Sequence, residues 1–307
     1  MPGGLKPEAE PILAGYAPSR FSHLSYSLRP PIGIYRLSLM KIWPRFEAML
    51  DAIWKVLQEK RYHERSVPWD DDMLESCERL LYSLFEHLGD CDSILKCCFP
   101  AGQDIDKNPH LREYHRDIKP YRDSIGRIVN RIKHNQCRLR SIVFYGDEWA
   151  SLGYFVETVH ADGAIGPDPR IHSGGKTAFS YARDLRHHFA WLYVISRSLA
   201  KAVKAILGSP TEVIVESASD DNKIAELAEQ LSFFPRIVYP DEELKGYPAV
   251  SYREEGQERE ILLVLLPPHL GPLPPPQNFR VNFSYRGDGV SHTFIVPYSG
   301  ELPAIRA

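Results

Sequence analysis

The sequence lacks the features that identify several large classes of protein. It contains no CxxC pairs, and its five cysteines are an odd number that makes neither a disulfide framework nor a zinc knuckle. Its longest uncharged apolar run, ILLVLL at 261–266, is far shorter than the roughly 20 residues that a membrane-spanning helix needs. A formal net charge of −3 gives no general attraction to nucleic acid or to an anionic membrane. Any site for a polyanion must therefore be a local patch.

The beginning of the chain shows a further absence. It has neither the charged start nor the apolar stretch of a signal peptide. Reduced and buried cysteines are typical of cytosolic proteins. We therefore expect a soluble cytoplasmic protein with no membrane partner.

The 307 residues, of which 43% are hydrophobic, are enough for about two domains. We expect an α+β protein. Residues 1–34 are rich in proline, glycine and serine and predict an extended arm that lies on the rest of the protein. Residues 35–207 predict a helical bundle, which a hairpin and a loop interrupt at about 139–175. Residues 210–307 predict a small, β-rich α+β domain.

Apolar residues at spacings of three and four predict the helices of the bundle. We expect Pro44 in the first turn of one helix, Gly89 at the end of the next, and Pro120 at the start of a third. The expected helices cover 43–60, 68–90, 119–136 and 178–207. β-Branched and aromatic residues predict the hairpin, and short strands after it at 211–217, 236–240, 249–253, 260–266, 279–286 and 291–298.

Cations gather in the stretch GRIVNRIKHNQCRLR, residues 126–140. On a helical wheel, Arg131, His134 and Arg138 fall within about 40° of Arg127. Asn130 lies about 60° to one side of Arg127. The aliphatic residues fall on the opposite half of the wheel, so the helix is expected to have one packed face and one cationic face.

Two interpretations of the cationic face are open. It can be an ordinary solvated face, in which Asp123 pairs with Arg127 four residues later. It can also bind and cleave RNA, because histidine titrates near neutral pH and the planar fork of arginine matches phosphate oxygens. Such cleavage requires no metal ion and no cofactor, since the 2′-hydroxyl of RNA supplies the nucleophile.

The motif NRIKHNQ, set in a helical region with a long following helix, resembles the HEPN superfamily (higher eukaryote and prokaryote nucleotide-binding domains). These domains are helical bundles, and many are metal-independent RNA-cleaving toxins or defence proteins. Their signature is an arginine followed by four to six residues and a histidine. Arg127 and His134 bracket six residues, which fits the loose form. In the tight form Asn130 fills the polar position, but Val129 stands where the arginine belongs.

The resemblance covers about residues 35–207 and implies an endoribonuclease that acts as a homodimer in a toxin or phage-defence setting. His134 is then the general base or acid. Arg127 and Arg131 hold the phosphate, and Asn130 orients the phosphate or the imidazole. Contacts to flanking phosphates, which predict salt-sensitive binding, are expected from Lys133, Arg138 and Arg140.

The alternative belongs to another class of protein. A HEPN-like bundle can be a non-catalytic scaffold that binds RNA, a nucleotide or a protein partner, with Val129 marking the loss of chemistry. The C-terminal region is then a candidate surface for the protein partner.

Two other motifs offer weaker sites. Gly174, Gly175 and Lys176 precede a predicted helix, whose N-terminus favours an anion, but Arg170 replaces the glycine that a phosphate loop requires. A loop with Thr177 as the helix cap is the alternative. The residues His160, Asp162, Asp168 and His172 are of metal-ligand type, although their aspartates are also typical of Asx turns. A metal hydrolase at His160 and His172 is therefore a third possibility, and His188 is expected in the core or an interface.

Overall fold

The computed structural model describes residues 2–60, 68–134, 137–210, 219–242, 245–255, 258–267, 278–281 and 293–299. The protein is a mixed α and β structure, as expected. Its helices are α1 (Ala9–Ala14), α2 (Pro31–Gln58), α3 (Pro68–Lys96), α4 (Pro109–His134), α5 (Tyr181–Leu207) and α6 (Ser219–Phe233). Its strands are β1 (Pro2–Gly4), β2 (Leu139–Tyr145), β3 (Ala150–Val159), β4 (Ile165–Pro167), β5 (Phe179–Ser180), β6 (Tyr247–Glu255), β7 (Glu258–Leu266) and β8 (Asn278–Val281).

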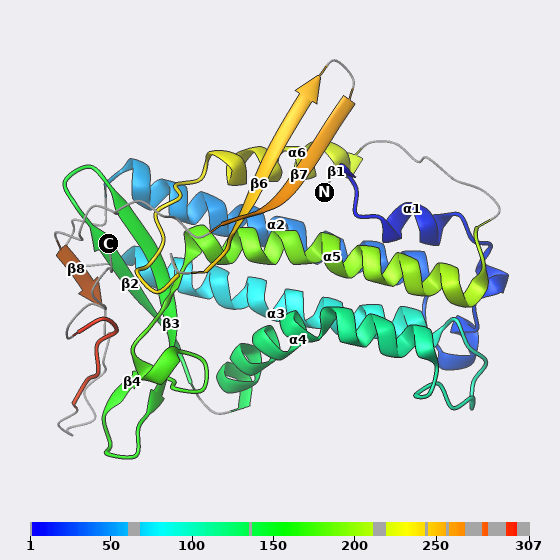
Figure 1. Cartoon of the computed structure of the whole chain (residues 1–307), viewed down its shortest axis with the longest axis horizontal. Coiled ribbons are helices and arrows are strands. Elements are labelled where there is room, and N and C mark those ends of the chain that lie inside the picture. Colours follow the sequence, from blue (N-terminus) through cyan, green and yellow to red (C-terminus); the bar gives the residue numbers. More distant parts are fainter. Residues whose placement is uncertain are drawn as a thin grey trace.

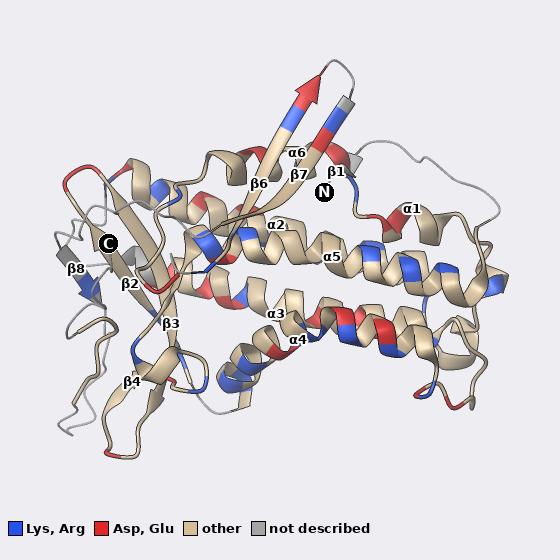
Figure 2. Ribbon diagram, in the orientation of Figure 1, with Lys and Arg blue, Asp and Glu red and all other residues tan. Residues whose placement is uncertain are grey.

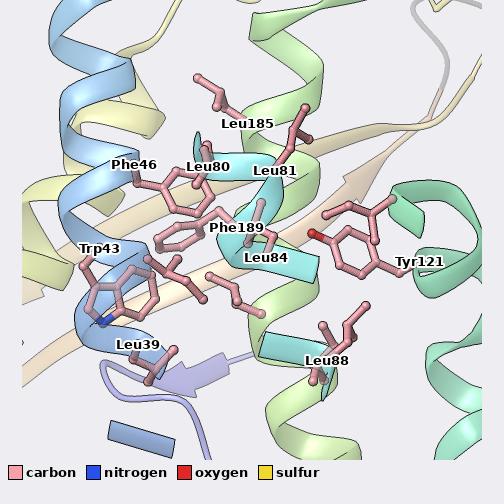
Figure 3. Packing of buried hydrophobic residues seen from close by; sticks show 14 of the residues in the cluster. Leu39, Trp43, Phe46, Leu80, Leu81, Leu84, Leu88, Tyr121, Leu185 and Phe189 are labelled. Atoms are coloured by element: carbon pink, nitrogen blue, oxygen red, sulfur yellow. The ribbon is translucent and has the colours of Figure 1, made fainter. Parts of the chain in front are cut away.

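Helices α2 to α5 form the body of the molecule and run along its long axis (Figure 1). Their apolar faces meet in one aromatic and aliphatic core, which Figure 3 shows from close by. Phe46 of α2 and Phe189 of α5 lie edge to face, with ring centroids 6.0 Å apart. Trp43 packs at 6.1 Å from the same phenylalanine ring of α5. Burial of this whole apolar cluster, of which these rings are a part, holds the helices together.

Three helices extend past the residues where we expected them to begin or end. α2 begins at Pro31 and contains Pro44, and α3 continues through Gly89. α4 begins at Pro109, where the weaker pattern of residues 108–120 also offers a helix start, and it continues through Pro120 without a break. Apolar residues that continue each stripe explain the difference. Cys91, Ile94 and Leu95 beyond Gly89 are fully buried or nearly so. Their burial outweighs the roughly 1 kcal/mol that a glycine costs inside a helix.

The predicted hairpin is present. β2 and β3 pair antiparallel from Leu139↔Val156 to Tyr145↔Ala150. β8 pairs with the other edge of β2, and β4 and β5 pair with β3. A second sheet has the order β1-β7-β6. The first sheet lies at one end of the bundle, and the β6–β7 hairpin passes over α5 (Figure 1).

The described residues after 210 share the core of the helices. Ile224 and Leu231 of α6, with Val250 and Ile261 of the β6–β7 hairpin, belong to the same buried cluster as α2 to α5. The predicted strand at 236–240 is a loop. Tyr239 of this loop donates a hydrogen bond to the carbonyl of Ile142 (2.7 Å). The predicted strand at 211–217 lies outside the described residues.

The first 34 residues are not extended throughout. They contain α1 and two short 3₁₀ turns, and α1 lies against α5, where the Ala9 N–H donates to the hydroxyl of Ser196 (2.7 Å). None of the helices that the described residues form is both long enough and apolar enough to cross a lipid bilayer.

Candidate phosphate-binding groove

A groove of about 820 Å³ lies between α3, α4 and the loop at 168–171. Four guanidinium groups line it, together with the amide of Asn130 and the carboxylates of Asp92 and Asp123. Figure 2 shows basic residues along α4, including its C-terminal end. The arginines are Arg122, Arg127, Arg131 and Arg170.

The sequence of α4 turns its polar face to this groove. Ile125, Ile128 and Ile132 are buried, whereas Arg127 and Asn130 are exposed, as the helical wheel predicts. Gly126 lets α3 come close, because a Cβ atom there would lie only 3.2 Å from Cε2 of Phe85. The groove floor is therefore the edge of the packed core.

Two of the four arginines already have carboxylate partners. Arg122 holds both oxygens of Asp92, at 2.7 and 2.8 Å. Arg131 pairs through Nε with Asp168, a side chain that is only 1% exposed, and its Nη2 donates to Thr158 Oγ1 (2.9 Å). These pairs fasten α4 to α3 and to the loop, and they neutralise their own charge.

Arg127 and Arg170 form no ion pair with the described residues. The expectation that Asp123 neutralises Arg127 is wrong. The Asp123 carboxylate binds Lys119 (2.6 Å), and Arg127 Nε donates to the Asp123 backbone carbonyl (3.0 Å). Arg170 is presented by an Asx turn, in which its own N–H donates to Asp168 Oδ1 (2.9 Å). The groove thus has an uncompensated cation on each of two elements.

The other predicted site residues lie elsewhere. His134 and Lys133 are exposed in the last turn of α4 and are not among the groove-lining residues. Arg138 is exposed but lies beyond the end of the helix, so the helical wheel does not apply to it. Arg140 is 7% exposed and binds both oxygens of Glu157, at 2.7 and 3.0 Å. Of the predicted set, the groove brings together Arg127, Asn130 and Arg131.

Val129 is 2% exposed and packs in the core. An arginine at this position, as the tight form of the HEPN signature has it, would point its charge into apolar surroundings. Such a charge would be costly there, since no described residue is placed to pair with it; an apolar side chain suits this position.

Asp162, Asp168 and His172, which are residues of metal-ligand type, have structural roles. Asp162 accepts from the Ala164 N–H (3.0 Å), which with the turn at Asp168 confirms the Asx-turn interpretation. His172 Nε2 accepts from the Val156 N–H (2.9 Å), and burial lowers the pKa of this histidine to about 3. Within the described residues, no three histidine, cysteine or acidic side chains are grouped as a metal site requires.

The glycines before α5 do not lie at its N-terminus. Ser180 is the cap and accepts from the Arg183 N–H (3.3 Å), so the expectation for Thr177 is wrong. Gly174 and Gly175 have positive φ and belong to a separate 3₁₀ turn, seven and six residues before the first residue of the helix. His188 is buried, as expected, and its Nδ1 lies 3.0 Å from the hydroxyl of Tyr121.

Sequence reasoning missed Arg170 as a groove residue. It lies about 40 positions after Arg127, and only the fold of the loop against α4 brings it there. Comparisons of the chain with family models, curated proteins and solved structures found no match. A functional assignment therefore depends on the groove itself.

Proposed function

We propose that the protein binds RNA and holds its phosphates between Arg127 and Arg170. The observation that carries this proposal is the pair of unneutralised guanidinium groups on two sides of one groove. Arginine matches two phosphate oxygens at once and is weakly hydrated, so it suits a partly desolvated phosphate.

The groove also suits the rest of a nucleotide. Phe85 and Ile171 line it, are partly exposed, and give a base an apolar surface. Single-stranded RNA has unstacked bases that reach such surfaces, whereas a duplex conceals them. The exposed amide of Asn130 is placed to contact a base edge or the 2′-hydroxyl.

Binding is tested by fluorescence anisotropy with a labelled single-stranded RNA of mixed sequence. We expect Arg127→Gln and Arg170→Gln each to weaken binding about tenfold. Each should also make the slope of the logarithm of the affinity against the logarithm of the salt concentration shallower by roughly 0.7 per lost phosphate contact. Arg116→Gln is the matched control, because Arg116 is an exposed residue of α4 that does not line the groove. If the wild-type protein and the three variants bind the RNA with equal affinity, the groove is not the RNA-binding site.

Metal-independent RNA cleavage is a second candidate function, favoured by the exposed position of His134 one helical turn after Asn130. The resemblance to HEPN proteins implies that two copies of α4 face one another, which supplies a second histidine at the scissile phosphate. The toxin or defence setting also comes from that resemblance.

Incubation of mixed RNA with the protein in EDTA separates binding from cleavage. If the protein cleaves, His134→Ala abolishes cutting and retains binding, and light scattering detects a dimer. His110→Ala, which removes a histidine from the first turn of α4 and does not touch the groove, is the control. Intact RNA with the wild-type protein leaves binding as the function, and cutting that survives in His134→Ala eliminates the proposed catalytic residue.

A further inference from the structure

A second cavity, of about 800 Å³, lies between α5, the β6–β7 hairpin and the segment before α1. Its walls are mostly apolar and include Trp191, Val194, Leu263 and Leu265. Leu265 is 72% exposed, so one wall presents apolar surface to the solvent. The volume and the apolar lining are those of small-molecule sites.

One end of this cavity is polar. Arg183 and His187 lie one turn apart on α5, and both line the cavity. Arg183 donates one hydrogen bond, to the carbonyl of Gly246 (3.2 Å), while its buried Nε has no partner among the described residues. Arg183 also forms no ion pair with them. A guanidinium group in this state favours an incoming anion.

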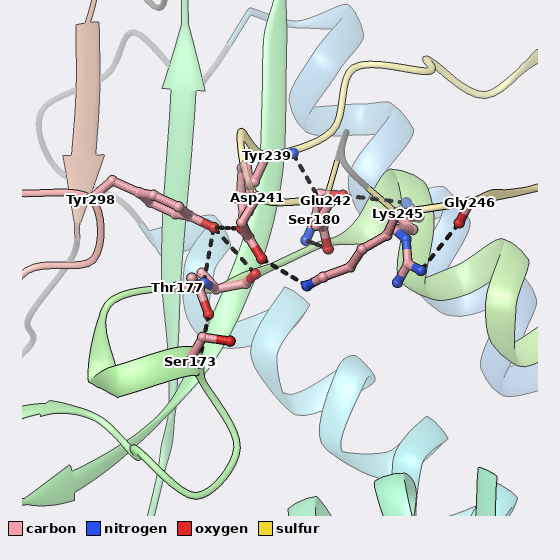
Figure 4. A network of polar contacts seen from close by, with 11 residues as sticks. Ser173, Thr177, Ser180, Tyr239, Asp241, Glu242, Lys245, Gly246 and Tyr298 are labelled. Carbon is pink, nitrogen blue, oxygen red and sulfur yellow. Dashed lines mark hydrogen bonds and ion pairs between the residues drawn. The ribbon is translucent and has the colours of Figure 1, made fainter. Parts of the chain in front are cut away.

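The charge of Arg183 acts on the carboxyl of Glu242, which already accepts three hydrogen bonds from other groups. It accepts from the Ser180 N–H (3.2 Å), the Ser180 hydroxyl and the Tyr239 N–H (3.1 Å), as Figure 4 shows. Burial raises the pKa of Glu242 to about 7, so the negative charge that it offers Arg183 is incomplete near neutral pH. Glu242 therefore does not neutralise Arg183 in the way that a bound anion would.

His187 is a neutral neighbour for such an anion. Burial, followed by the nearby His188, lowers the pKa of His187 to about 4. Its imidazole forms no hydrogen bond with the described residues and lies beside Trp191, with ring centroids 6.1 Å apart. A neutral imidazole can donate an N–H to an anion without adding a second charge.

We propose that this cavity binds a small molecule with an apolar body and one carboxylate. The carboxylate is held by Arg183 and His187, and the body lies along Trp191, Val194 and Leu263. The rise of α5 from 187 to 194 gives the body about 10 Å of apolar length. A single uncompensated cation favours a monoanion, since the second charge of a phosphate would be desolvated without a partner. The two other cations that line the cavity, Lys6 and Arg197, already face Asp221 (3.4 Å) and Glu8 (3.8 Å).

Titration calorimetry with decanoate, decanol and decyl phosphate tests the proposal on the full chain. The wild-type protein should bind decanoate more tightly than either other probe, and decanoate should raise the melting temperature. Arg183→Gln should weaken decanoate binding about 10- to 100-fold and leave decanol binding unchanged. Arg253→Gln, on the exposed surface of β6, is the matched control.

Ala190→Phe provides a test that keeps Arg183 intact. Ala190 lines the cavity, so the larger ring should fill it and remove binding of both decanoate and decanol. The absence of decanoate binding to the wild-type protein overturns the proposal, as does equal affinity for the acid and the alcohol. Tighter binding of decyl phosphate overturns the choice of a carboxylate. These comparisons involve the wild-type protein only, so a variant that fails to fold does not affect them.

Discussion

Arg131 and Asp168 form an ion pair that joins the last turns of α4 to the loop of the β-hairpin region. The carboxylate is 1% exposed, and its second oxygen shapes the turn that presents Arg170 to the groove. One partner of the pair thus fixes the helix, and the other fixes the position of a groove cation. The geometry of the groove depends on this pair.

We expect Asp168→Asn to destabilise the protein by about 3 kcal/mol, because it leaves the guanidinium of Arg131 without its charge partner in a largely buried place. Urea unfolding measures the change. Because the Oδ1 of asparagine still accepts from the Arg170 N–H, the turn should persist, and the loss should appear in the stability. Glu75→Gln, which removes the exposed partner of Arg79 on α3, is the control and should cost less than about 1 kcal/mol. Similar losses in the two variants would contradict the role of the buried pair.

Two glycines predict opposite effects of the same substitution. A Cβ atom on Gly153 of β3 would lie 2.0 Å from the carbonyl oxygen of Phe179 and 2.5 Å from the hydroxyl of Tyr239. Gly153→Ala must therefore separate β3 from β5, and we expect a loss of more than about 3 kcal/mol. A Cβ atom on Gly89 of α3 would meet nothing within 4 Å, so Gly89→Ala should stabilise the helix by about 1 kcal/mol. Thermal unfolding of both variants gives the two signs directly.

The packed and exposed faces of α4 could be predicted from the sequence, because a helical wheel needs only the period of the helix. The hairpin of β2 and β3 could be predicted for the same kind of reason, from local composition and periodicity. The first and last residues of α2 and α3 could not be predicted in this way. Pro44 and Gly89 are local signals against helix, but the burial of neighbouring apolar residues by other helices outweighs them.

The groove shows the same limit more clearly. Arg127 and Asn130 were predictable as members of an exposed polar face. The neutralisation of Arg131 and Arg140 was not, because their partners Asp168 and Glu157 come from a distant loop and from a strand. The spacing of residues along a helix predicts the direction of a side chain. Whether its charge is neutralised depends on the carboxylates that the fold places beside it.

The cysteines predict a chemical result. Five cysteines are free and buried, and burial raises the pKa of Cys97 to about 11 and that of Cys98 to about 12. Because the thiolate is the reactive form, we expect a disulfide reagent at pH 8 to label the native protein slowly and all five thiols rapidly in urea. Rapid labelling of even one thiol in the native protein would show that its segment opens more easily than its burial implies.

Three buried histidines predict how the stability depends on pH. Burial lowers the pKa of His87 and His187 to about 4, and that of His172 to about 3, from the ordinary value of 6.5. Between these values and 6.5 the unfolded chain binds protons that the folded protein does not, so stability is full above pH 6.5 and is lost as the pH falls toward 4. Glu242 opposes this trend, because its raised pKa makes the folded protein bind a proton between about pH 4.5 and 7. Because the three histidines outnumber Glu242, the protein should lose stability as the pH falls.

Urea unfolding at pH 7.5, 6.5, 5.5 and 4.5 measures this dependence, with a slope on the order of 1 kcal/mol per pH unit for each histidine. His87→Gln is the most informative variant. His87 lies on α3 and is fully buried between Ser38 (2.8 Å) and Cys91 (3.6 Å). It lines neither the groove nor the second cavity. Because three histidines are opposed by Glu242, the variant should reduce the slope between pH 6.5 and 4.5 by about one half, whatever it does to the stability at pH 7.5. A slope that is equal in His87→Gln and in the wild-type protein would mean that His87 takes up its proton in the folded state.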